Sequence, residues 1–133
     1  MILDQQQIFS DAQVITATAN STNIIDVLGK RDLGAGEQLR CVMQIKDNST
    51  AVPTFTAALV GADDSGFSTN KITIGSITPT LTVGGAQLAH IGIPAHAGKR
   101  FFRIEYTITG GTSPSQTVTA GFAHTEQNSA MTV

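Results

Sequence analysis

The sequence predicts an all-β domain, a jelly-roll or β-sandwich of about eight antiparallel strands with extended terminal arms. Three observations favour this fold class. Apolar and polar residues alternate over most of the 133 residues, turn-forming residues recur between these stretches, and no stretch keeps the 3.6-residue period of an amphipathic helix. Only 14% of the residues are charged, and Thr, Ala, Gly, Ile and Val are abundant, which is typical of half-buried strands.

The clearest expected strand covers residues 102–109, where apolar side chains occupy every second position. Residues 38–46 repeat the pattern, and only Val42 breaks their polar side. Gly, Asn and Asp, which adopt positive φ or close turns with their side chains, gather between the strands. In chain order the expected strands span residues 14–19, 24–28, 38–46, 54–60, 71–77, 88–93, 102–109 and 116–124.

These strands predict one domain over residues 14–124, with an N-terminal arm of residues 1–13 and a C-terminal tail of residues 125–133. The arm holds more apolar side chains than a solvated tail needs, and such a terminus is usually ordered only when it docks. It either packs across the end of its own sandwich or embraces a neighbouring subunit or shell. Its candidate anchors are Ile2, Leu3, Ile8 and Phe9.

Charge and hydropathy argue against nucleic acid and membranes as partners. The formal net charge is −2, and the eight Lys and Arg residues form no stripe able to neutralise several phosphates. The apolar stretches, such as residues 54–60, are far shorter than the ~20 residues of a membrane span. The first residues resemble no secretory signal, and Cys41 is a single cysteine, so we expect a cytosolic site of synthesis.

The residues that could carry chemistry form no recognisable constellation, so we expect no enzyme, no metal and no cofactor. His90, His96 and His124 lack the spacing of zinc ligands, and we expect them to bond backbone or water. Asp63 and Asp64 lack the alternating acids and later Glu of a calcium loop, which favours an exposed turn.

The sequence also shows no complete motif for a catalytic nucleophile or for dinucleotide binding. Residues 66–70 stop one glycine short of a nucleophile elbow, and residues 34–36 are too short for a dinucleotide fingerprint. Cys41 lies on the apolar face of its expected strand, where a thiol behaves as a small hydrophobic group.

The densest positive charge precedes and enters the 102–109 strand. It consists of Lys99, Arg100 and Arg103. Two interpretations remain open, because such side chains either contact an acidic partner surface or belong to a solvated turn.

Both ends of the chain resemble a known family. Residues 1–13 (MILDQQQIFSDAQ), 15–19 (ITATA) and 23–26 (NIID), together with residues 98–106 (GKRFFRIEY), 110–111 (GG) and 118–121 (VTAG), are similar to capsid cement (decoration) proteins of short-tailed bacteriophages. The middle of the chain fits this family mainly in its pattern.

The resemblance implies a jelly-roll homo-oligomer, a dimer or trimer, that is made in the host cytoplasm and sits on the outer surface of the virion capsid. There it would bridge subunits of the major capsid protein without a cofactor. Ile2, Leu3, Ile8 and Phe9 would anchor it, and Lys99, Arg100 and Arg103 would add polar contacts.

Two other classes of function compete with this one. The first is another phage structural protein, of tail or head-completion type, which the composition fits equally well. The second is a receptor- or carbohydrate-binding sandwich. Sugar platforms need exposed Trp or Tyr, whereas this chain has no Trp and one Tyr, Tyr106, expected on a buried face.

Overall fold

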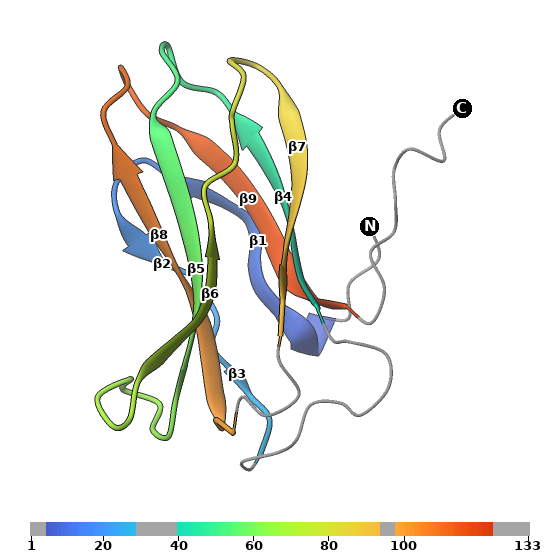
Figure 1. Ribbon diagram of the computed structural model, residues 1–133. Helices are drawn as coiled ribbons and strands as arrows, with labels where there is room; N and C mark the ends of the chain where they lie inside the picture. The colour runs from blue at the N-terminus through green and yellow to red at the C-terminus, as the bar shows by residue number, and fades with distance from the viewer. Residues whose placement is uncertain (1–4, 29–39, 94–97, 124–133) are drawn as a thin grey trace.

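The computed structural model describes residues 5–28, 40–93 and 98–123, which fold into two antiparallel β-sheets (Figure 1). The all-β prediction is confirmed. After a 3₁₀ turn, η1 (Gln5–Gln7), the strands are β1 (Ile8–Ile15), β2 (Ala19–Asn20), β3 (Ile25–Asp26), β4 (Arg40–Asp47), β5 (Thr54–Ala62), β6 (Ile72–Ile77), β7 (Ala86–Gly92), β8 (Phe101–Thr109) and β9 (Gln116–Ala123).

The strand order is that of a jelly roll. One sheet has the order β1-β9-β4-β7, and the other has the order β2-β8-β5-β6, with β3 also pairing with β8. If β2 and β3 are counted as one interrupted strand, the pairs are nested: β1 with β9, β2/β3 with β8, β4 with β7 and β5 with β6. Such nesting arises when a long hairpin wraps into two sheets with Greek-key connections.

The predicted boundary between arm and sandwich differs from the structure. Residues 8–13 belong to β1, and the strand expected over residues 14–19 instead spans the corner between β1 and β2. The reason is local: β1 shifts register twice against β9, and Ala12 adopts a φ of 47°. Such bulges interrupt the alternation that reveals a strand in a sequence.

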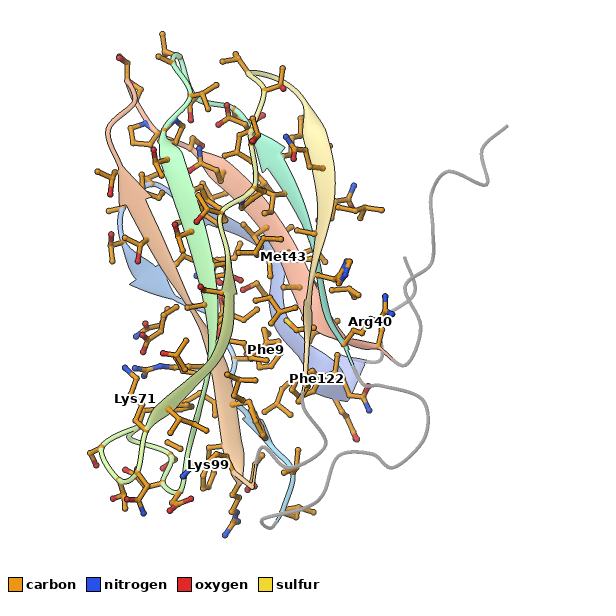
Figure 2. All side chains as sticks on the ribbon, viewed as in Figure 1. Phe9, Arg40, Met43, Lys71, Lys99 and Phe122 are labelled. Atoms are coloured by element: carbon orange, nitrogen blue, oxygen red, sulfur yellow. The ribbon has the colours of Figure 1, made fainter. Side chains whose placement is uncertain are left out.

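Aromatic side chains join the two sheets in the core. Phe9 of β1 and Phe122 of β9 meet edge to face with ring centroids 4.8 Å apart, and Phe122 meets Phe102 of β8 at 5.7 Å. Figure 2 shows Phe9 and Phe122 between the sheets, below Met43. Phe9, Phe102 and Met43 are each fully buried, so this cluster lies at the centre of the packing.

Buried polar side chains also form hydrogen bonds within this core and at one of its ends. The Tyr106 hydroxyl lies 2.8 Å from Ser10 Oγ across the sandwich. At one end, Asp47 Oδ1 accepts hydrogen bonds from Ser49 Oγ (2.6 Å) and Gln116 Nε2 (2.7 Å), and all three side chains are buried. These bonds tie the end of β4 to the start of β9.

A tight turn lies at the same end. Ala51 and Thr112 exchange two backbone hydrogen bonds of 3.2 Å, which bring the segment before β5 against the segment after β8. Gly111, with a φ of +75°, packs where a Cβ would lie 2.8 Å from the carbonyl oxygen of Ala51. Only a glycine fits this position without displacing backbone.

Candidate functional site

The predicted basic cluster is present, but each of its three members has an acidic partner within the chain. Lys99 Nζ lies 3.6 Å from Asp63 Oδ1, and both side chains are largely buried. The stem of Lys99 also packs on Gly61, where an added Cβ would come within 3.0 Å. Lys99 therefore closes the lower end of the sandwich, as Figure 2 shows.

Arg100 is held by a bidentate ion pair. Its Nε and an η-nitrogen donate to the two carboxylate oxygens of Asp26, at 2.8 and 2.9 Å. The hydrogen-bonded Arg100 guanidinium lowers the pKa of Asp26, and the Asp26 carboxylate in turn raises the pKa of Arg100. The guanidinium also lies 4.8 Å from the centre of the Phe101 ring. The pair joins β3 to the start of β8.

Arg103 lies on the outer face of its sheet, between an acid and an aromatic ring. It donates to Glu105 Oε1 at 2.6 Å, and its guanidinium lies 4.2 Å over the ring of Phe67. Lys71 reaches the same Glu105 oxygen at 2.7 Å. Burial raises the pKa of Glu105, but the hydrogen bonds from Lys71 and Arg103 outweigh it, so that the pKa is lowered overall.

The loop after β5 folds around Asp64. Its carboxylate accepts from the backbone N–H groups of Ser68 (3.0 Å) and Thr69 (2.7 Å) and from the Ser68 hydroxyl (2.8 Å). These bonds lower the pKa of Asp64. Phe67 is buried beside Val60 and anchors the loop. The turn expected at residues 63–64 is therefore a closed, side-chain-bonded loop.

The predicted anchors of the arm have different positions. Ile2 and Leu3 lie outside the described residues. Ile8 is half-buried and pairs with Gly121, whereas Phe9 has no exposed surface. Phe9 is thus a core residue, and the expectation that it anchors the protein to a partner is wrong, because its ring is already enclosed by Phe122 and its neighbours.

The other candidate residues are not brought together. His90 lies on the outer side of β7, and His96 and His124 lie outside the described residues. Within the described parts of the chain, no three His, Cys, Asp or Glu side chains are grouped so that they could hold a metal ion. In the same residues, no helix has the length and apolar character needed to cross a membrane.

Cys41 is fully buried in the core, and burial raises the pKa of its thiol to about 12. At pH 8 only on the order of one thiol in ten thousand would then be ionised, and the thiolate is the reactive form. We expect iodoacetamide to leave the folded protein unmodified and to label Cys41 once guanidinium unfolds it. A Val14→Cys variant should gain one adduct while folded, because Val14 is 60% exposed. Rapid labelling of Cys41 in the folded chain, read by mass spectrometry, would contradict this placement.

The fold and these contacts define a jelly-roll β-sandwich in which Lys71, Lys99, Arg100 and Arg103 are each paired with an acidic side chain of the same chain. The chain belongs to the Bbp16 family, whose model matches residues 9–126. This match begins within β1 and so includes part of the segment predicted as an arm. Comparison with curated proteins gives no match.

Some features were missed from the sequence. Phe67 follows two acids and a glycine in a turn-like segment, and nothing in that pattern predicts its burial under Arg103. The buried cluster of Asp47, Ser49 and Gln116 at the end of β4 was only weakly indicated by the sequence. Gln116 precedes Val118, Ala120 and Phe122 at the two-residue period of the inward face, so its burial could have been predicted.

Proposed function

We propose that this protein is a structural, non-enzymatic virion component that binds the outside of a phage capsid and cements neighbouring major capsid subunits as a homo-oligomer. The observation that carries the proposal is the similarity to phage cement proteins of short segments near both ends of the chain, residues 1–13, 15–19, 23–26, 98–106, 110–111 and 118–121. A jelly roll is compatible with this role, because such sandwiches present flat faces on a stiff core.

The outer face of the β5–β8 sheet supports a contact role. Its upper part carries cross-strand threonine pairs, Thr54 with Thr109 and Thr56 with Thr107. Thr56 Oγ1 also lies 2.9 Å from Thr78 Oγ1. Short neutral side chains can be covered by a protein surface without stripping water from a charge, which would cost several kcal/mol per buried ion.

The basic cluster contributes less to the proposed capsid contact than the sequence alone suggests. Because Lys99, Arg100 and Arg103 are each paired within the chain, a shell contact would have to share or replace an existing partner. Ile2 and Leu3 are therefore our first choice as shell anchors. Many weak contacts of this kind would add across the joints of a shell, and binding only the mature shell would stabilise that state.

The only tyrosine of the chain, which a carbohydrate-binding site would need as a stacking platform, is not accessible to a sugar. Tyr106 is fully buried, it stacks on Phe55 at 5.7 Å, and its hydroxyl meets Ser10. Its ring has no free face for a sugar.

The proposal is tested by adding purified protein to expanded capsids that lack it. We expect the wild type to co-sediment with the shells and to raise the temperature at which they break open. An Ile2→Asp, Leu3→Asp double variant should be retained at least about tenfold less, since burying two carboxylates in an apolar contact is unfavourable. A Val14→Ser variant is the matched surface control.

The outcomes are distinct. Electron microscopy should place added density outside the shell. Failure of the wild type to co-sediment, or density confined to the tail, would overturn the proposal; tail density would favour the tail or head-completion alternative. Equal retention of the double variant would remove Ile2 and Leu3 as anchors.

A further inference from the structure

The described strands leave four sheet edges, and three of them are interrupted. An exposed edge offers unpaired backbone groups to other chains, and natural sheets blunt such edges with bulges or by keeping the strand short. β1 shifts register twice, and β2 and β3 are two residues each. β6 shifts register against β5 between Leu59 and Val60, which leaves Ile74 without a partner in the ladder.

The fourth edge, β7, has none of these interruptions. Its seven residues pair with β4 in unbroken register, from Ala86 opposite Lys46 to Gly92 opposite Arg40. The strand sequence AQLAHIG contains no Asp, Glu, Lys, Arg or Pro. The described residues give β7 no second ladder, and Figure 1 shows it as the last strand of its sheet. This is the most regular edge in the described part of the fold.

β7 is also held firmly in place. Its inward side chains Ala89 and Ile91 are buried in the core. Ile91 packs against β6 so closely that a Cβ on Gly75 would lie 2.7 Å from it. On the outward side Leu88 keeps 37% of its surface exposed. A strand fixed in this way can accept a partner strand without reorganising, which lowers the entropy lost on binding.

We propose that the β7 edge pairs antiparallel with the β7 edge of a second copy, about a two-fold axis beside Leu88. A strand without charged side chains pairs well with a second strand that also lacks them, because no like charges are then placed opposite each other, which would be destabilising. The same strand in a second copy meets this condition, and a two-fold contact is the commonest way identical chains associate. With the axis at Leu88, the two Leu88 side chains lie opposite one another and cover their exposed surface.

This contact would be modest in isolation. A single edge of seven residues buries less than the ~800 Å² per partner of a standard stable interface, so the pairing gains most when copies are held close together. The inference specifies the contact between copies that the proposed cement function leaves open. It is tested without capsids, so its failure can be told apart from a failure of that function.

Disulfide trapping captures even a weak contact. In a Leu88→Cys variant under mild oxidation we expect a covalent dimer to form at least about tenfold faster than in Val14→Cys, because pairing raises the local concentration of the thiols. Val14 is exposed on the interrupted β1 edge and so provides the matched control. The native Cys41 is buried and stays reduced in both.

A charge at the same position gives the second measurement. We expect the wild type to form a concentration-dependent dimer in sedimentation, and Leu88→Lys to abolish that dimer while leaving the thermal unfolding temperature nearly unchanged. Equal trapping at positions 88 and 14, or a dimer that persists in Leu88→Lys, would overturn the inference. Loss of trapping with capsid retention intact would overturn only the β7 contact, and trapping without retention would overturn only the cement function.

Discussion

Replacing Phe9 with alanine is expected to lower the free energy of unfolding by about 3–5 kcal/mol, the range found when a buried phenylalanine is truncated. Phe9 has no exposed surface, and it packs edge to face on Phe122, which in turn contacts Phe102 of the opposite sheet. Removing the ring would leave a cavity where the two sheets meet. Denaturant unfolding followed by circular dichroism measures the loss.

Val14→Ala is the control on the same strand. Because Val14 is 60% exposed, its truncation should change the unfolding free energy by only about 0.5 kcal/mol. A Phe9 variant as stable as this control would contradict the assignment of Phe9 to the core. By the same reasoning, a truncation that removes residues 1–9, and with them Phe9, should unfold the sandwich.

Replacing Gly111 with alanine is expected to destabilise the protein by roughly 2–4 kcal/mol. A non-glycine residue at positive φ costs about 1–2 kcal/mol, and the new Cβ would also press on backbone atoms. Its nearest neighbours would be Ala51 O at 2.8 Å and Pro53 Cα at 2.9 Å. These atoms belong to the turn that holds β5 against β8, so they cannot move independently.

Gly110 is an adjacent, matched control. It has nearly the same φ, +72°, but nothing lies within 4 Å of its would-be Cβ. Gly110→Ala should therefore show the φ effect alone, about 1–2 kcal/mol. The difference between the two variants isolates the contact with Ala51 and Pro53. Equal destabilisation of both would mean that this contact contributes nothing.

The sequence was a good guide wherever strands have one wet face. The expected strand over residues 102–109 differs from β8 by one residue, because every second side chain of β8 enters the core. The strand expected over residues 38–46 is confirmed for residues 40–46, which lie in β4, for the same reason, whereas residues 38–39 lie outside the described residues. The strand prediction failed over residues 8–13, where a bulge places Ser10 and Gln13 inward and hides the two-residue period.

The candidate site was less predictable than the fold. The cluster of Lys99, Arg100 and Arg103 is visible in the sequence, but its partners Asp63, Asp26 and Glu105 come from three different elements. Arg103 and Glu105 lie two residues apart on one face of β8, so the alternation of the strand predicts that pair. The partners of Lys99 and Arg100 depend on which distant elements pack together, and local pattern does not specify that packing. The uninterrupted edge at β7 likewise becomes visible only when the four edges are compared.

The nested strand pairing also has a kinetic consequence. β1 obtains its only ladder from β9, at the far end of the described chain, so a ribosome must release nearly the whole sandwich before the first strand finds its neighbour. All-β folds with such distant pairings fold on the order of milliseconds to seconds. Until then Phe9 and the other core side chains stay open to solvent, so nascent chains at high local concentration can associate through them.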